Sequence, residues 1–228
     1  GRRILEAWAK RNDASFTGMI IPNVFGPFGN AFYNSVVATF CHQLTHYEQP
    51  EIQIDGELKL IYVGELVEKF YETIKDKRNK KKIESYPVSH TSTHKVSEIL
   101  ALLESYKEDY LVNGVFPDLT DPFKRNLFNT FVCYMDIKDH YPVKLKLNTD
   151  DRGSFVETVK LKTGGQVSFS TTKPGITRGN HFHIRKAERF AVIKGKARIQ
   201  LRRIGNDEIL NFDLDGSQPS YVDMPTWY

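Results

Sequence analysis

Cysteine, tryptophan and methionine are scarce in this sequence, with two, two and three residues among 228. The two cysteines, Cys41 and Cys133, lie far apart and follow apolar neighbours, which predicts buried thiols rather than a disulfide. No apolar run approaches the ~18 residues of a membrane-spanning helix, and no secretory signal peptide is present. The sequence therefore favours a cytoplasmic protein without membrane insertion.

A large charge of one sign is also absent, because the formal net charge is +4 with 26% charged residues. One basic run, from Lys75 to Lys82, holds five lysines and one arginine. Such a run is typical of a solvated loop or helix end, and the alternative is a patch that binds phosphates or nucleic acid. Since no aromatic-interleaved basic motif accompanies it, we expect no nucleic-acid partner.

Helices and strands alternate over the first 130 residues or so, which predicts an α/β domain. Apolar positions 4, 5, 7, 8 and 9 form one face of an amphipathic helix. Two prolines and two glycines predict a loop over residues 22–29. The predicted helices are 2–11, 34–46, 64–74 and 96–106, and the predicted strands are 16–21, 52–54 and 58–63.

Short strands separated by turn signals replace this pattern after about residue 130, which predicts an all-β sandwich or barrel. The turn signals include Gly164-Gly165, Pro174-Gly175, Gly205-Asn206-Asp207 and Asp215-Gly216. The fold class is thus α/β plus all-β. We place the domain boundary between residues 133 and 134, giving domains 1–133 and 134–228.

Two histidines and a glutamate, His181, His183 and Glu188, form the most informative constellation. On a strand, the two histidines would point to the same face because side chains alternate. Two imidazoles and a carboxylate suit zinc, and also iron, nickel or manganese. The alternative is a pair of surface histidines beside an ordinary exposed glutamate.

The segment from Gly175 to Gly195 fits Gly-x5-His-x-His-x4-Glu-x6-Gly and thereby resembles the first motif of the cupin family. This resemblance implies a small β-barrel in which His181, His183 and Glu188 bind Zn²⁺ or another divalent metal. Gly216 and the later Pro-Thr-Trp resemble the start of the second cupin motif, with tryptophan where glycine is usual. The last metal ligand is expected beyond Tyr228.

A second resemblance links this region to nucleotide-sugar 3,5-epimerases. Asp151–Glu157 resembles their entry strand, and Arg178–His181 resembles their Arg-Gly-x-His strand. The resemblance implies that Arg152 and Arg178 contact substrate and that Glu157 and Arg178 are candidate catalytic residues. A surface ion pair between Arg152 and Glu157 is the structural alternative.

The first 130 residues resemble the back half of an extended short-chain dehydrogenase/reductase, a Rossmann-type domain. Pro22–Pro27 resembles the loop beside nicotinamide, and Asn34 matches a position that contacts the nucleotide diphosphate of the substrate. Leu60–Glu65 resembles the Tyr-Val-Asp-Asp stretch but departs from it at its last two residues. The catalytic tyrosine and lysine and the glycine-rich loop are expected before Gly1. The implied cofactor-binding residues are Pro22, Asn23 and Val24.

Together, these segments resemble the bifunctional capsular polysaccharide enzymes of the bacterial N-acetyl-L-fucosamine pathway. The resemblance implies a homodimer in which the cupin epimerises C3 of a UDP-4-keto-6-deoxy-HexNAc. The reductase domain then reduces C4 with NADPH to give UDP-2-acetamido-2,6-dideoxy-L-talose. We interpret the chain as a fragment that does not itself reduce a ketosugar. Alternatives are a metal cupin of another enzyme class, or a non-catalytic cupin that binds sugar or supports dimerisation.

Overall fold

The structure, a computed structural model, describes residues 1–76, 83–185 and 187–228. Lys77 to Lys82 of the basic run lie outside the described residues. The chain divides into two compact units. The first comprises Gly1–Asn148 and Ser154–Ser170, and the second comprises Thr149–Gly153 and Thr171–Tyr228. The domain boundary between residues 133 and 134 stays a prediction.

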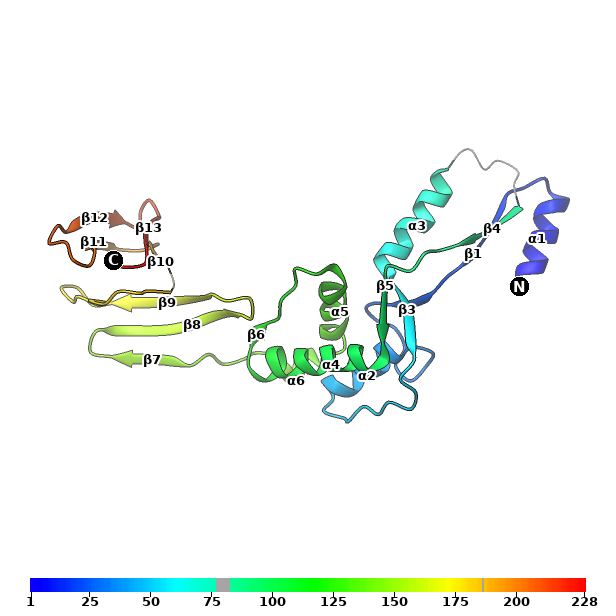
Figure 1. Ribbon diagram of the computed structural model, residues 1–228, viewed down its shortest axis with the longest axis horizontal. Helices are drawn as coiled ribbons and strands as arrows, with labels where there is room; N and C mark the ends of the chain where they lie inside the picture. Colours follow the sequence, from blue (N-terminus) through cyan, green and yellow to red (C-terminus); the bar gives the residue numbers. More distant parts are fainter. Residues whose placement is uncertain (77–82, 186) are drawn as a thin grey trace. The chain divides into compact units, whose positions relative to one another are not determined.

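All described helices belong to the first unit, and the second consists of strands and turns (Figure 1). The helices are α1 (Arg2–Arg11), α2 (Val36–Thr45), α3 (Val63–Lys75), α4 (Val96–Tyr106), α5 (Pro122–Val132), α6 (Ile137–His140) and a π-helix over Lys107–Val112. The first strands are β1 (Phe16–Ile20), β2 (Asn23–Phe25), β3 (Glu57–Tyr62), β4 (Ile83–Pro87), β5 (Ser92–Lys95) and β6 (Val115–Phe116). No helix in the described ranges is long and apolar enough to cross a membrane.

The sheets of the first unit include β2, β4, β5 and β6, which the sequence did not predict as strands. β1 pairs with β4 in parallel, while β3 lies between parallel β2 and antiparallel β5. β2 falls within the segment predicted as a loop, because its pairing with Leu60–Tyr62 is a long-range interaction that proline and glycine counts do not report. The predicted strand over residues 52–54 is wrong. Ile52 packs against the core and Ile54 is exposed, but neither pairs with a neighbouring strand.

Helices α2, α4 and α5 pack together over the largest core cluster (Figure 1). Ile99, Leu103, Leu127 and Phe131 are fully buried there. Cys41 is buried among them, and burial raises the pKa of its thiol well above the ordinary range. Cys133 is exposed, so the prediction of a buried thiol is wrong for that residue, because it follows the last turn of α5. Both cysteines are free.

The remaining strands form narrow sheets. They are β7 (Leu147–Asp150), β8 (Gly153–Leu161), β9 (Gln166–Thr172), β10 (Glu188–Val192), β11 (Lys196–Leu201), β12 (Leu210–Asp215) and β13 (Ser220–Met224). β8 pairs with β6, β7 and β9, while β10–β13 and β11–β12 are antiparallel pairs. Within the described residues these sheets do not close into a barrel, in contrast to the expectation from the motif.

Two glycines permit close backbone approaches in the second unit. The Gly216 N–H donates to the Gly195 carbonyl at 2.8 Å, and a Cβ at residue 216 would lie 2.4 Å from Lys194 N. The glycine that ends the first cupin-like motif therefore contacts the glycine that opens the second. Gly153 has φ +148°, and a Cβ there would lie 2.0 Å from the Thr171 carbonyl oxygen.

We predict that Leu103→Ala lowers the free energy of unfolding by about 2–5 kcal/mol, because it leaves a cavity in a fully buried site. Urea unfolding followed by circular dichroism measures this change. Ile54→Ala is the matched control, since Ile54 is 81% exposed. Equal destabilisation by the two substitutions would contradict the assignment of the core.

Candidate functional site

Three side chains of the second unit converge at one point. His181 Nε2 lies 3.2 Å from His183 Nε2, which lies 3.1 Å from Glu188 Oε1. The ligand atoms of the three residues all lie within 4.8 Å of one another. Bonds of about 2.0–2.2 Å in a tetrahedral shell place neighbouring donor atoms roughly 3.3 Å apart. Two of the donor–donor distances match this spacing, and the donor set is of a kind that binds a divalent ion.

A turn rather than a strand delivers the two histidines. Residues 178–185 and 187 form no regular strand, so the alternation of side chains along a strand does not explain why the two histidines converge. Gly179 and Asn180 have φ of +89° and +64°, a left-handed conformation that these residue types tolerate. The following imidazoles of His181 and His183 meet edge to face with centroids 4.8 Å apart. Glu188 then opens β10.

The turn after β13 contacts the histidine segment. The Trp227 N–H donates to the His183 carbonyl at 2.9 Å, and the Trp227 and Phe182 rings stack with centroids 6.1 Å apart. Trp227 has φ +69°, which costs a non-glycine residue about 1–2 kcal/mol. Sequence reasoning did not identify this contact. The sequence feature that could have indicated this contact is Trp227 itself, which occupies a position where the second cupin motif has glycine.

An open pocket of about 510 Å³ adjoins the candidate ligands and is lined by Phe182, His183, Ile184 and Arg185. The side chains of His183 and Glu188 are 22% and 26% exposed, while His181 is exposed. A ligand atom from solvent or substrate could thus reach an ion at this point.

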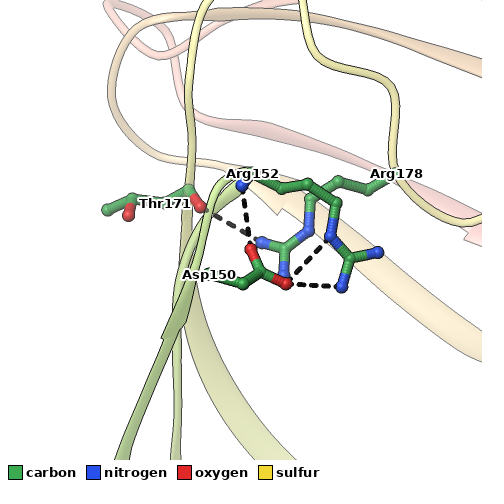
Figure 2. Close-up of polar contacts among 4 residues, drawn as sticks. All are labelled: Asp150, Arg152, Thr171 and Arg178. Carbon is green, nitrogen blue, oxygen red and sulfur yellow. Dashed lines mark hydrogen bonds and ion pairs between the residues drawn. The ribbon is translucent and has the colours of Figure 1, made fainter.

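Two arginines lie together elsewhere in the second unit. Figure 2 shows the guanidinium of Arg178 beside the pair formed by Asp150 and Arg152. Asp150 Oδ2 accepts from Arg152 Nε at 2.9 Å and Nη2 at 2.6 Å, and Arg178 Nη1 donates to the Thr171 carbonyl at 3.1 Å. Two positive charges face one carboxylate, so the group carries an excess positive charge.

The alternative ion pair between Arg152 and Glu157 is not formed. Arg152 pairs with Asp150, while the carboxylate of Glu157 lies 2.7 Å from Lys160 Nζ. The hydrogen bond from the Arg152 side chain lowers the pKa of Asp150 to about 2, so this carboxyl group is ionised at neutral pH. Asp150 was not among the predicted site residues, although it directly precedes the entry-strand motif.

The residues predicted to lie beside a nicotinamide occupy the start of β2. Asn23 and Val24 pair with β3, directly after Pro22. Asn34 has φ +52° and precedes Ser35, whose hydroxyl accepts from the Ala38 N–H at the start of α2.

Glu65, one of the two departures from the reductase pattern, has a structural role. Its Oε2 accepts from the Tyr62 N–H at 3.2 Å and from the Thr91 hydroxyl at 2.7 Å. The carboxylate therefore caps the first turn of α3.

Comparisons with protein families divide the chain in a similar way. Residues 1–89 match the NAD dependent epimerase/dehydratase family. Residues 148–228 match the polysaccharide biosynthesis C-terminal domain. The chain is similar to a UDP-sugar reductase. It is 32% identical over 212 residues to UDP-2-acetamido-2,6-beta-L-arabino-hexul-4-ose reductase of Pseudomonas aeruginosa, covering 91% of the chain and 55% of the relative.

Solved structures of the capsular polysaccharide assembling protein CapF of Staphylococcus aureus are also similar. One is 32% identical with a TM-score of 0.85, covering 100% of this chain and 61% of that one. A further solved structure, of CapF with the inhibitor 3-isopropenyl-tropolone, is 32% identical with a TM-score of 0.84, covering 100% of this chain and 65% of that one. The chain thus spans between about half and two thirds of the length of these relatives.

We predict that Arg152→Ala raises the pKa of Asp150 from about 2 towards the ordinary value of 3.8. Since the pKa is lower in the folded state, the ion pair contributes to stability above pH 3.8, and this contribution is lost as the pH falls through about 2. Carbon-13 NMR of the carboxyl groups measures the titration. Asp118, whose pKa is lowered by the Thr120 side chain, is the control that should not move.

Proposed function

We propose that this chain is part of a bifunctional nucleotide-sugar enzyme of capsular or O-antigen polysaccharide biosynthesis. A metal-dependent cupin comprising residues 134–228 epimerises C3 of a UDP-4-keto-6-deoxy-HexNAc. A reductase domain that includes residues 1–133 reduces C4 with NADPH to UDP-2-acetamido-2,6-dideoxy-L-talose. The convergence of His181, His183 and Glu188 is the observation that carries the proposal.

The names of the relatives support the substrate class. The Pseudomonas aeruginosa relative is named as a reductase of a UDP-linked 2-acetamido sugar whose ketone is at C4. The Staphylococcus aureus relative is described as a capsular polysaccharide assembling protein. The match of residues 1–89 to an NAD dependent family supports a nicotinamide cofactor. The homodimer and the cytoplasmic location remain predictions.

Epimerisation at C3 requires removal of a proton that is acidic because the C4 ketone can accept the charge as an enolate. A divalent metal, when bound by the three ligands, supplies positive charge that stabilises the developing enolate oxygen. Proton exchange at C3 further requires a base on one face of the sugar and a donor on the other. Glu157 is the candidate base, and Arg178 is a candidate hydrogen-bond donor to the enolate oxygen rather than the proton donor.

One solved CapF structure contains the inhibitor 3-isopropenyl-tropolone, whose oxygen atoms resemble those of the proposed ketosugar substrate. A tropolone carries a carbonyl and a hydroxyl on adjacent carbons, and such a pair of oxygens chelates divalent cations. The keto group and neighbouring hydroxyl of a 4-ketosugar present a similar pair of oxygens.

Arg152 and Arg178 are proposed to contact the diphosphate of the substrate. Guanidinium groups donate paired hydrogen bonds to phosphate oxygens, and their charge does not depend on pH in the physiological range. Asp150 neutralises one of the two and holds it in place, while the carbonyl of Thr171 orients the other. The remaining positive charge is available to the substrate.

For the reductase part, we propose that Pro22, Asn23 and Val24 lie against nicotinamide. The pairing of β2 with β3 supports this, because it fixes the backbone of Asn23 and Val24. Asn34 is proposed to contact the nucleotide diphosphate. Asn34 directly precedes the N-cap of α2 and therefore lies at the N-terminal end of this helix. The helix dipole favours negative charge at that end.

We predict that His183→Ala in the full-length enzyme abolishes C3 epimerisation but leaves C4 reduction measurable. Loss of one of three protein ligands weakens metal binding, and an unstabilised enolate costs about a hundredfold or more in rate. Deuterium exchange at C3 of the 4-keto UDP-sugar measures the first step, and NADPH oxidation measures the second. NMR of the product reports the C3 configuration, and elemental analysis reports bound metal.

His90→Ala serves as a matched control, because it removes an exposed histidine outside the candidate ligand set. Normal C3 exchange in the metal-depleted His183 variant would show that the cupin is not the epimerase. Loss of both activities in a folded variant would show that the two steps are coupled and that the proposed division is wrong. Exchange absent from the wild-type enzyme would favour a non-catalytic sugar-binding or dimerisation role.

A further inference from the structure

One strand and the turn that follows it contact both segments that carry candidate metal ligands. β13 pairs with β10, so that Met224 lies opposite Glu188. Three residues later, the Trp227 N–H donates to the carbonyl of His183. The backbone of residues 224–227 therefore supports the glutamate on one side and a histidine on the other.

We propose that Trp227 is a positioning residue for the metal centre, which holds the His181–His183 segment in register with Glu188. The inference rests on the proposed metal site and adds a residue that does not itself bind the ion. It acts through two contacts, its backbone N–H on the His183 carbonyl and its indole ring on the Phe182 ring.

The histidine segment has little other backbone support. Among the hydrogen bonds between described backbone groups, residues 177–185 and 187 take part in one, the bond from Trp227 to His183. Because this segment forms no strand, the position of His183 relative to β10 depends on that bond and on side-chain packing. The Trp227 carbonyl in turn accepts from the Ile204 N–H at 2.9 Å, which fixes the peptide from its other side.

The conformation of Trp227 separates this role from ordinary stabilisation. Its φ of +69° lies in the region that favours glycine, so the indole is present despite a backbone cost. Trp227→Gly relieves this cost while removing the ring that stacks on Phe182. We therefore expect the metal-free protein to keep or raise its melting temperature while its metal affinity falls. A residue that only stabilises the fold would lower both together.

The test is a titration of purified protein with Zn²⁺ in competition with a chromophoric chelator. Trp227→Gly and Phe182→Ala should each weaken binding by about tenfold, the effect typical of partners that orient ligands. Trp227→Phe keeps an aromatic ring and should restore most of the affinity. Phe212→Ala is the matched control, since it removes a partly exposed ring from β12 without altering either contact.

A spectroscopic readout keeps the test independent of folding differences. The chain has two tryptophans, so Trp8→Phe leaves Trp227 as the sole source of tryptophan emission. Co²⁺ bound at the site should quench this emission in the Trp8→Phe protein, and His183→Ala should abolish the quenching. The Co²⁺ absorption spectrum of Phe182→Ala should shift if the ligand geometry has relaxed.

The outcomes distinguish the proposed metal site from the proposed positioning role of Trp227. Wild-type protein that binds neither Zn²⁺ nor Co²⁺ would overturn the metal site itself and the positioning role with it. Wild-type binding with unchanged affinity and spectra in Trp227→Gly and Phe182→Ala would overturn the positioning role alone. Parallel loss of melting temperature and affinity in both variants would assign Trp227 to general stability and overturn the inference as well.

Discussion

The pairing of β10 with β13 is the constraint on which the candidate metal centre depends. Glu188 is the first residue of β10, and its place in the sheet is set by the register with Met224. The histidines lie on a segment without regular structure that reaches this sheet through the turn after β13. The convergence of the donor atoms, which lie 3.1–3.2 Å apart, therefore depends on long-range strand pairing as well as on the local His-x-His spacing.

Charged pairs dominate the surface of the strands in the second unit, yet they contribute little to its stability. Arg189–Asp223 and Arg198–Asp213 are directly opposite in register, with nitrogen–oxygen distances of 2.8 and 2.7 Å. Exposed pairs of this kind contribute about 0–1 kcal/mol each, because water screens them. These pairs favour the observed register of the strands. A slip by one residue would place each charged side chain opposite an apolar group or a like charge. The Asp150–Arg152 pair is similarly exposed and acts by orienting a guanidinium.

Local sequence patterns predicted the elements whose formation depends on local interactions. The helices α1, α2, α3 and α4 follow from apolar periodicity and agree with the structure to within about two residues. The prediction missed α5, although its N-cap at Asp121 is a local signal. The errors in the strands arise where partners distant in sequence decide the outcome. Asn23–Phe25 is a strand because β3 lies beside it, and residues 52–54 are not a strand because none does.

The same limit applies to the candidate site. A fixed motif could identify His181, His183 and Glu188, because spacing alone carries that signal. It could not identify Asp150 as the partner of Arg152 or the contact of Trp227 with His183, since both depend on side-chain packing. The prediction that Cys133 is buried failed for a related reason. Apolar neighbours in sequence do not determine which side of a helix faces the core.

The small core of the second unit gives the proposed metal a structural consequence. Among its described residues, Leu201 and Met224 are the buried large apolar side chains, whereas Phe182, Ile193 and Trp227 are well exposed. Burying two such side chains contributes about 3–6 kcal/mol, which is small against the entropy of ordering a segment of this length. Ligation of a structural divalent metal can supply about 10–16 kcal/mol of apparent free energy. A metal bound by three residues from two segments would therefore order the unit as well as serve its chemistry, so its removal should loosen the strand pairs that position the ligands.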